Sequence, residues 1–459
     1  MTAPHDTIGD AAYAAIRYGY GYSKRPIPRS ADQLLARLAT GDVMADRFRT
    51  MPFDETRVLL DEFIAARSIR EESAENEKAY QAVRGRIRQA ESQQMLRAFA
   101  RITDTEDPFR ERLVWFWADH FTARAKSLPN HPGTMSYVDA AIRPNITARF
   151  ADILQAAVLH PVMLLYLDQN ISYGPNSVAG LRHGRGLNEN LAREILELHT
   201  LGVSASYTQT DVTEFAELLT GLTYNRTNGW HFSMALAEPG AEYVLGNAYG
   251  SDDAPQRGDI VQALEDIAMR PETAAHVCTK LARHFVAEDP DYNMVSSMIA
   301  AWRATAGDLM AVYEAMLAHP AAWSGFGAKV KLPFDYLASA LVALHVRGYD
   351  IVRLERTPIQ SLLYGPLVRM GQPFLLPRGP DGWPEGEADW ITPQGLAERI
   401  TWAMRAPKAL VEPLPAPRRF VTTALGDVAS ARTVFAATAA ETRQDGIGLV
   451  LASPEFNRR

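Results

Sequence analysis

The chain has 459 residues, of which 47% are hydrophobic and 22% are charged, and its formal net charge is −7 at pH 7. Because a single hydrophobic core stops growing at roughly 250–300 residues, we expect one very large domain or two to three lobes. The negative charge excludes a general nucleic-acid binder, since no basic excess is present to neutralise phosphates.

The N-terminal region, residues 1–25, has no basic segment followed by an unbroken apolar run, so the sequence predicts no secretory signal. The longest apolar runs, such as residues 336–346, are too short to span a bilayer. Cys278, the single cysteine, excludes an internal disulfide and a cysteine-based metal site, and its apolar helical surroundings predict a core position. We therefore expect a soluble, cytoplasmic protein without a membrane span, with export by another route left open.

Most of the chain carries apolar residues at three- and four-residue spacing, which predicts helices. In chain order these patterns cover residues 31–40, 56–102, 107–121, 137–168, 211–224, 259–269, 271–287, 293–320, 334–348 and 392–404. The polar stretch 71–90 predicts a long exposed helix or a helix pair with a solvated face. Asp211 and Asp308 are the expected N-caps of their helices.

Strand signals are confined to residues 224–250, where turn residues separate short aromatic or branched segments. The predicted fold class is therefore all-α, a large multi-helix globular protein with a small irregular or β insert near 224–250. A soft boundary near 322–335 divides a main helical domain, 1–325, from a C-terminal helical lobe, 326–459, packed on it. One continuous domain is the alternative.

Two long loops interrupt the helical pattern, and long loops inside a compact region are usually functional or disordered. Residues 171–186 are rich in glycine and carry Arg182, a candidate anion-binding residue. Residues 371–390 are dense in proline, glycine and tryptophan, so no helix persists through them. The tryptophans at 383–390 leave open a carbohydrate-binding module.

The segment 187–202, LNENLAREILELHTLG, predicts an amphipathic helix with several ionisable side chains. Glu194 lies closest to the apolar stripe, so we expect it to be drawn inward, where a carboxylate needs a cation, a metal or a strong donor. Glu194 and Glu197 have the spacing of half a carboxylate metal site in a helical bundle, but a structural polar network explains the spacing as well. His199 projects about 160° away from Glu197 on a regular helix, so the two cannot bind one metal.

The same segment and its continuation resemble the bacterial domain of unknown function 1800 (DUF1800) family. The matching residues are Asn188, Glu189, Asn190, Arg193, Glu194, Glu197, His199, Gly202, Tyr207, Thr208, Gln209, Asp211, Glu214 and Gly221. Further matching segments are FWADHF, HPVMLLYLDQN, PETAAHVCTKLARHFV, KVKLPFDYLASAL, GQPF with DGWPEGEADW, and the terminal LASPEFNRR. The resemblance therefore covers nearly the whole chain.

The chain departs from the family pattern around residues 237–243. The family tends to have His-Asp before Pro-Gly, where this chain has Ala237 and Glu238, and a common lysine is replaced in the AEY segment that follows. Leu222 replaces a usual tryptophan, and the acid after the KxP motif is Asp335. If the family's chemistry used the His-Asp pair, this member would be divergent or inactive at that point.

Other candidate residues lie outside the central helix. His120 is on the apolar side of its helix, either as a core histidine or as a site residue. Asp168 opens the first loop, where pocket-lining and turn-forming roles are equally plausible. Glu214 and Glu217 form a second i, i+3 carboxylate pair, which raises a weaker hypothesis of a two-metal site.

Our leading hypothesis is an enzyme of unknown reaction acting on a polyhydroxylated or phosphorylated envelope-type substrate, and a divalent metal is a possible cofactor. The candidate catalytic residues are Glu194, Glu197, His120 and Asp168, and the candidate binding residues are Asn188, Glu189, Asn190, Arg193, Arg182, His199, Gln209 and Asp211. Glu194 or Glu197 would act as general base or metal ligand, and Arg193 or Arg182 as an anion clamp. The alternative is a non-enzymatic helical scaffold with a buried polar network. The family resemblance also implies a phosphatase- or sulfatase-like partner protein.

Overall fold

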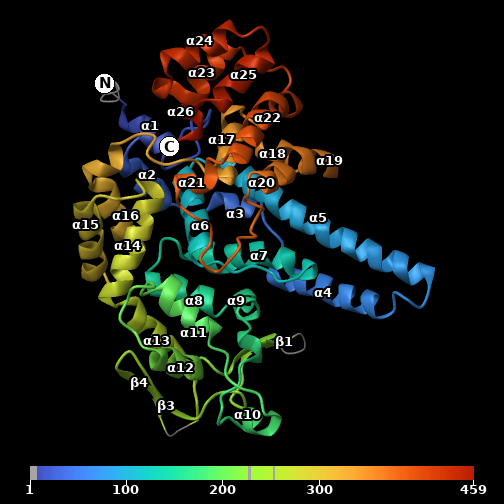
Figure 1. Ribbon diagram of the computed structural model, residues 1–459, viewed down its shortest axis with the longest axis vertical. Helices are drawn as coiled ribbons and strands as arrows, with labels where there is room; N and C mark the ends of the chain where they lie inside the picture. The colour runs from blue at the N-terminus through green and yellow to red at the C-terminus, as the bar shows by residue number, and fades with distance from the viewer. Residues whose placement is uncertain (1–7, 226–228, 252–253) are drawn as a thin grey trace.

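The N-terminal third of the chain forms part of the middle of the body and a helical arm that projects to one side (Figure 1). The computed structural model describes residues 8–225, 229–251 and 254–459, so the start of the N-terminal segment and parts of the predicted insert lie outside it. The helices of this third are α1 (Asp10–Ile16), α2 (Ala31–Leu38), α3 (Val43–Arg47), α4 (Phe53–Ser68) and α5 (Ala74–Asp104). The polar stretch 71–90 lies mostly in α5, which with α4 builds the arm, so the first of the two predicted forms, a long exposed helix, is confirmed.

The arm has a small core of its own. Phe63 of α4 packs with Tyr80, Val83 and Ile87 of α5. Ser73 begins α5 by accepting a hydrogen bond from the amide of Asn76, which satisfies one of the free N–H groups at a helix start. The arm is therefore held by a local apolar seam, and most of its charged side chains face solvent.

The middle third contains shorter helices than the sequence predicts. They are α6 (Pro108–His120), α7 (His131–Tyr137), α8 (Phe150–Val158), α9 (Pro161–Tyr166), α10 (Val178–His183), α11 (Asn190–Glu194) and α12 (Gln209–Leu218). The predicted helix 137–168 breaks near Pro144 and Pro161 because proline lacks an amide donor. The predicted loop 171–186 contains α10. Ser177 caps the start of this helix, and Gly184, whose backbone is in the left-handed conformation, caps its end.

Two details of α12 correct the sequence prediction. The helix ends at Leu218, not Tyr224, because Gly221 has φ +90°, which turns the chain out of the helix. Its N-cap is Thr208 rather than Asp211. Asp211 lies three residues later and accepts the reciprocal hydrogen bond from the Thr208 amide at 2.8 Å, which completes a capping box.

The predicted insert is confirmed as two small antiparallel hairpins. Strand β1 (Leu222–Asn225) pairs with β2 (Gly229–Phe232), with Leu222 opposite Phe232. Strand β3 (Gly240–Val244) pairs with β4 (Asn247–Ser251), with Glu242 opposite Tyr249. The β3–β4 hairpin lies beside α12 and the β1–β2 hairpin beside α9, both in the half of the molecule opposite the C-terminal helices (Figure 1).

The last part of the chain is again helical. Its helices are α13 (Arg257–Ala268), α14 (Pro271–Phe285), α15 (Tyr292–Ala304), α16 (Leu309–Ala318), α17 (Pro333–Ala343), α18 (Gly348–Ile351), α19 (Arg356–Ile359), α20 (Gly365–Arg369), α21 (Glu387–Trp390), α22 (Pro393–Leu410), α23 (Pro417–Leu425), α24 (Ala431–Ala439), α25 (Arg443–Ala452) and α26 (Pro454–Asn457). Asp308 caps α16 as predicted, accepting from the amide of Ala311. Among the described residues, no helix combines the length and apolar character that crossing a bilayer requires.

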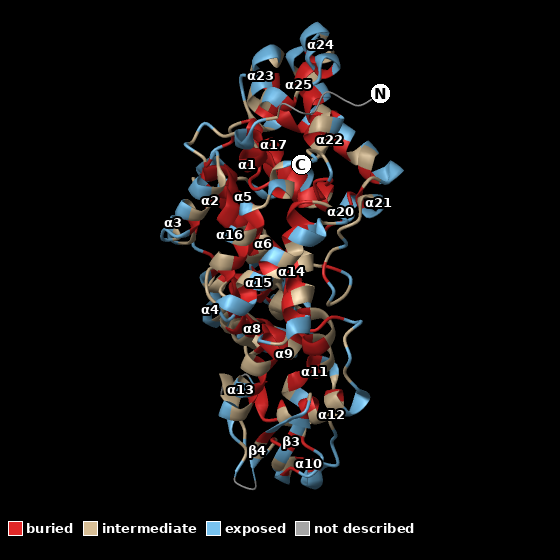
Figure 2. Cartoon of the chain, turned by 90° about the vertical axis from the view of Figure 1, so that its left-hand side faces the viewer, coloured by how far each residue is buried: buried red, intermediate tan, exposed pale blue. Residues whose placement is uncertain are grey.

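A continuous apolar core runs along the long axis of the molecule (Figure 2). It includes residues from Ala12 near the N-terminus to Phe456 near the C-terminus. Helix α14 shows how the sequence builds it, because its buried positions follow the helical repeat. Cys278 is one of these positions and is fully buried, which confirms the predicted core role. The division into residues 1–325 and 326–459 stays a prediction.

Candidate functional site

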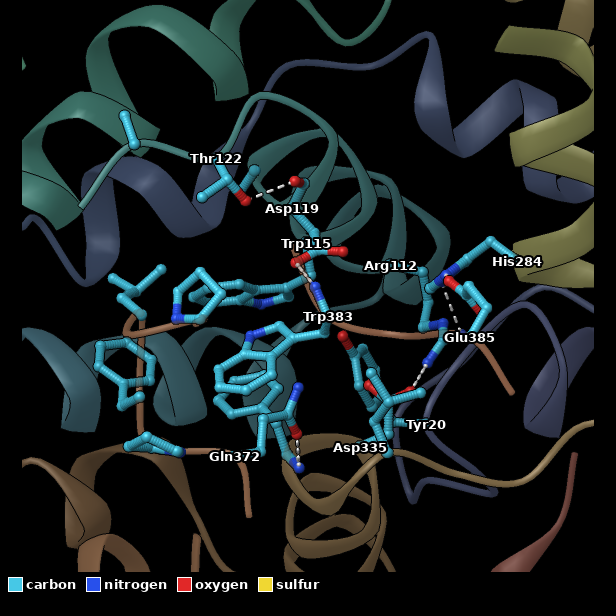
Figure 3. A pocket seen from close by; sticks show the side chains of 18 residues that line it. Tyr20, Arg112, Trp115, Asp119, Thr122, His284, Asp335, Gln372, Trp383 and Glu385 are labelled. Carbon is cyan, nitrogen blue, oxygen red and sulfur yellow. Dashed lines mark hydrogen bonds and ion pairs between the residues drawn. The ribbon is translucent and has the colours of Figure 1, made fainter. Parts of the chain in front are cut away.

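A pocket opens where α6, α14, α17 and the loop 371–385 meet (Figure 3). Its cavity volume is about 70 Å³. The wall is part aromatic, with Trp115, Phe334, Phe374 and Trp383, and part polar. Because one water needs roughly 10–15 Å³ of cavity volume, the cavity holds about five to seven waters, or one small chemical group of a ligand.

The polar side of the pocket is built on a buried carboxylate, Asp335. Arg112 of α6 donates to Asp335 Oδ2 at 2.5 Å, and the C-terminal residue Arg459 donates to the same oxygen at 2.6 Å. Both guanidinium groups are almost completely buried. Such a network is costly to disrupt, because removing one partner leaves a buried charge unpaired. It fixes α6, α17 and the end of the chain relative to one another.

A second carboxylate, Glu385, comes from the loop. It pairs with Nδ1 of His284 at 2.5 Å and with Nζ of Lys329 at 2.8 Å. Burial opposes the charge of Glu385, but His284 and Lys329 outweigh it and hold the pKa of this carboxyl well below its usual range. Nε2 of His284 lies 3.3 Å from Arg112, so the two networks touch. Glu385 is therefore an ionised group with its charge already neutralised.

Asp119 is the third carboxylate and differs from the other two. It lies near the end of α6 and accepts a hydrogen bond from the amide of Trp383 at 2.9 Å. Burial raises the pKa of Asp119 to about 7, with the Trp383 amide and the charge of Lys280 only partly opposing it. The side chain is enclosed by protein but keeps partial access to the pocket. Asp119 is thus poised to gain or lose a proton near neutral pH.

Gly382 lets the loop approach Asp119 closely. Its φ is +80°, and a Cβ at this position would lie 2.7 Å from Asp119 Oδ1. Any other residue would be strained in this conformation and would collide with the carboxylate. The glycine therefore holds the Trp383 amide in position to bind Asp119.

Glu194, the residue the sequence predicted to be drawn inward, is half-buried on α11. Burial first, then the charges of Glu197 and Asp381, raise the pKa of Glu194 to about 7. The charge of Asp381, on the loop that lines the pocket, also contributes to the raised pKa of Asp119. Asp381 thus connects Glu194 electrostatically with the pocket, although Glu194 does not line it.

The neighbours of Glu194 in the central segment form a polar network instead. Arg193 donates to Glu189 at 3.1 Å and to Glu197 at 3.2 Å, so it is not a free anion clamp. Glu189 also accepts from Gln209 at 2.9 Å and from Thr213 at 2.8 Å, which ties α11 to α12. These side chains hold the two helices together at the surface.

The side chain of Asn188 forms hydrogen bonds with the backbone, and Asn190 takes part through its own backbone amide. Asn188 donates from its side chain to the carbonyl of Asp168 at 3.2 Å and accepts from the amide of Asn190 at 2.9 Å. The side chain of Asn190 is exposed. This arrangement fixes the entry of the chain into α11.

His120 and His199 lie together behind the pocket wall rather than in it. The Nε2 of His120 bonds the backbone carbonyl of His199 at 3.0 Å, and the Nδ1 of His199 bonds the backbone carbonyl of His120 at 2.9 Å. Burial lowers the pKa of His199 to about 3 and that of His120 well below its usual value. Residues 195–199 form a π-helical turn rather than a regular helix, and His199 is buried away from Glu197.

Asp168 and Arg182 are not brought to Glu194. Asp168 has a left-handed backbone, φ 59°, and forms an ion pair with Lys126 at 2.6 Å. Arg182 is exposed on α10, at the far end of the molecule from the C-terminal helices (Figure 1). The pocket beside Asp119 is lined neither by the central segment 187–202 nor by the 168–186 loop, and His120 does not line it.

The described residues contain one set of three metal-type ligands close together, and it is acidic. Ligand oxygens of Glu214, Glu217 and Glu242 lie within 4.8 Å of one another. Burial and the charge of Glu217 raise the pKa of Glu242 to about 8, so the set shares protons near neutral pH. Glu238, at the departure from the family pattern, lies close enough to raise the pKa of Glu217. Glu194 and Glu197 belong to no such set among the described residues.

Sequence reasoning missed most of the pocket. Asp119, His284, Asp335 and Glu385 were not proposed as site residues, although each lies in a segment that carried the family resemblance. One signal was available, because a carboxylate inside an otherwise apolar helix, such as Asp335 in PFDYLASALVA, must have a buried partner. Four of the segments that carried the resemblance, FWADHF, PETAAHVCTKLARHFV, KVKLPFDYLASAL and GQPF with DGWPEGEADW, contribute residues to the pocket wall.

Comparison with known proteins identifies the family of the chain. The model of a protein family of unknown function, DUF1800, matches residues 15–458. No curated protein and no solved structure matches the chain. Because the family model covers nearly the full length, the chain belongs to the DUF1800 family.

Proposed function

We propose that the chain is an enzyme that carries out acid–base chemistry in the pocket, with Asp119 as its proton-transfer group. The observation that carries this proposal is the carboxyl of Asp119, which reaches the pocket and has a pKa of about 7. A general acid or base is most effective when its pKa lies near the working pH. Asp119 is then protonated in about half of the molecules near pH 7 and can serve in either direction.

The contrast between Asp119 and Glu385 supports this role. The two carboxyls share one pocket, but burial raises the pKa of Asp119 whereas His284 and Lys329 lower that of Glu385. Carboxyl pairs whose pKa values are pushed apart are typical of acid–base sites, where one group carries the proton and the other stays ionised. Glu385 stays ionised and holds the loop and His284 in position, and Asp119 transfers the proton.

Glu194 is proposed as a second proton-transfer group, outside the pocket lining. Its pKa of about 7 and the shared influence of Asp381 support a link to Asp119. Arg193 and Glu189 are reassigned to a structural role, because their hydrogen bonds are made to each other and to α12. The long central motif thus serves mainly to hold Glu194 in place.

The proposed substrate is polyhydroxylated or phosphorylated and of the envelope type. The aromatic and polar sides of the pocket support a hydroxylated ligand. A phosphatase- or sulfatase-like partner protein, which the family resemblance implies, belongs to the same proposal, as does a cytoplasmic location, which the lone reduced Cys278 supports. A divalent metal, where one is required, would find its carboxylate ligands at Glu214, Glu217 and Glu242.

A paired substrate screen tests the proposal. Purified wild type, Asp119→Asn and Glu197→Gln are incubated with polysaccharides, synthetic glycosides and phosphorylated sugars, and reducing ends and free phosphate are measured between pH 5 and 9. We expect turnover by wild type with an inflection near pH 7, a loss of about 10²-fold or more in Asp119→Asn, and near-normal turnover in Glu197→Gln.

A non-enzymatic scaffold is the second candidate. The reciprocal hydrogen bonds of His120 and His199 and the Glu189–Arg193 network favour it, because they fix helix packing. No turnover by the wild type on any of these substrates would exclude the proposed activity and favour the scaffold, whereas equal turnover by wild type and Asp119→Asn would exclude the role of Asp119 and the scaffold alike.

A further inference from the structure

Three buried polar groups of residues in the pocket wall have no hydrogen-bond partner among the described residues. One is the Nε of Arg112, whose other two nitrogens contact Asp335 and His284. The others are the hydroxyl of Tyr20, whose side chain is almost fully buried, and the indole N–H of Trp115. A buried polar group without a hydrogen bond is costly, and one that lines a cavity indicates that water or a ligand completes it. Tyr20 can both donate and accept, whereas the indole of Trp115 only donates.

The hydroxyl of Tyr20 stays protonated under physiological conditions. Burial, reinforced by the nearby charge of Asp335, raises the pKa of Tyr20 well above its usual value. Figure 3 shows the hydroxyl of Tyr20 on the polar side of the space, with Arg112 and Asp335, while Trp115 and Trp383 lie on the other side. A ligand between them meets hydrogen-bonding groups on one side and aromatic rings on the other.

The aromatic side is a preorganised wall. The rings of Trp115 and Phe334 lie 4.7 Å apart, and Phe374 packs against both, at 5.8 Å from Trp115 and 6.0 Å from Phe334. Trp383 is held by the hydrogen bond from its amide to Asp119 and by edge contact with Trp390. Aromatic faces of this kind suit the C–H face of a sugar ring, because they bury apolar surface without needing a charge.

The charges of the pocket disfavour an anion. Its lining carboxylates are Asp119, Asp335 and Glu385, and its basic side chains, Arg112 and His284, are already paired with the last two. A phosphate group would meet no unpaired cation in the wall. The charge of Lys280 interacts with that of Asp119, but Lys280 does not line the pocket.

We propose that the pocket binds an uncharged hydroxylated unit, such as one sugar residue of a larger glycan, and selects against a phosphorylated one. The ligand's hydroxyl oxygens accept from the indole N–H of Trp115 and exchange hydrogen bonds with Tyr20, and its apolar face packs on Trp383. The small cavity takes one face of the sugar, and the remainder extends past the loop 371–385 toward solvent. This inference rests on the proposed function, because it sets the ligand beside Asp119.

Binding measured separately from turnover tests the inference. Ligand-observed NMR and calorimetry at pH 7 compare the methyl glycosides of glucose, galactose, mannose and N-acetylglucosamine with glucose 6-phosphate and inorganic phosphate. We expect at least one neutral glycoside to bind and the two phosphates not to bind. Tyr20→Phe should weaken that binding about tenfold, because one buried hydrogen bond to the ligand is lost while the ring remains.

Tyr137→Phe is the matched control. Its hydroxyl donates to the backbone carbonyl of Phe121 at 2.8 Å, and Tyr137 does not line the pocket. We expect Tyr137→Phe to keep the wild-type affinity for the glycoside. The melting temperature of Tyr20→Phe should equal that of wild type, since no protein partner loses a bond.

The outcomes separate this inference from the acid–base role. Glycoside binding that Asp119→Asn retains while losing turnover supports both, and glycoside binding together with unchanged turnover in Asp119→Asn supports the inference alone. Binding of glucose 6-phosphate or phosphate but of no neutral glycoside overturns the inference, as does binding of no probe at all. Equal affinity in wild type and Tyr20→Phe overturns it as well.

Discussion

Replacing Asp119 by asparagine should stabilise the protein at alkaline pH. The ordinary pKa of an aspartate is 3.8, whereas that of Asp119 in the fold is about 7. The folded state therefore holds this proton more tightly than the unfolded state, and it loses stability as the pH rises from 3.8 through 7. Asparagine has the same shape, carries no charge, and can still accept from the amide of Trp383.

The magnitude follows from the gap between the two pKa values. The step from 3.8 to about 7, at 1.36 kcal/mol for each pH unit, sets an upper limit of about 4 kcal/mol above pH 7. Because the side chain keeps partial access to the pocket, we expect a gain of about 1–3 kcal/mol. For 459 residues the unfolding entropy is about 1 kcal/mol per kelvin, so the melting temperature should rise by about 1–3 °C.

Thermal unfolding at pH 5 and pH 9 measures this effect. We expect Asp119→Asn to melt above wild type at pH 9 and by about a third of that margin at pH 5, because at pH 5 the unfolded carboxyl has lost its proton while the folded one keeps it. A variant that is less stable than wild type at pH 9, or a difference that does not change with pH, would refute the reasoning. Stability gained at the expense of activity is expected where a charged group is kept buried for function.

The other predictions use the same physical terms. Glu194→Gln should raise the melting temperature above pH 7 by less than Asp119→Asn does, because Glu194 is less enclosed. Glu197→Gln should lower the unfolding free energy by under about 1 kcal/mol, because it loses only a solvent-accessible ion pair. Differential scanning fluorimetry measures both changes. Since burial holds the pKa of His199 near 3, the unfolding free energy should fall as the pH drops below 6.5, and denaturant titrations should show a shallower fall in His199→Asn. Magnesium or calcium should raise the wild-type melting temperature at pH 8 if the acidic set binds a metal, and Glu242→Gln should abolish that rise; an equal rise in both proteins would rule out this set.

Local features of the chain could be predicted from the sequence because they depend on near neighbours. Helical periodicity identified the fold class, and Arg193 does lie beside Glu197, four residues away. Glu194 is half-buried, as its position next to the apolar stripe predicted. The helix breaks at Pro144 and Gly221 were missed because the periodic pattern continues across them.

The pocket could not be predicted because its contacts join distant parts of the chain. The amide of Trp383 reaches Asp119 across 264 positions, and Arg112 reaches Asp335 across 223. No spacing rule connects such residues. The sequence therefore pointed to its longest run of polar residues, 187–202, which forms a surface network. The burial that raises the pKa of Asp119 exists only once α6 and the 371–385 loop are packed together.

The protonation of Asp119 is the most direct test of the proposed site. Infrared difference spectra of wild type minus Asp119→Asn report the carbonyl stretch of this one carboxyl in its protonated form, and can be followed from pH 3 to pH 10. The account predicts that the band is present at pH 5 and disappears with a midpoint near 7. A midpoint near the ordinary 3.8 would contradict the assignment of Asp119 as the proton-transfer group.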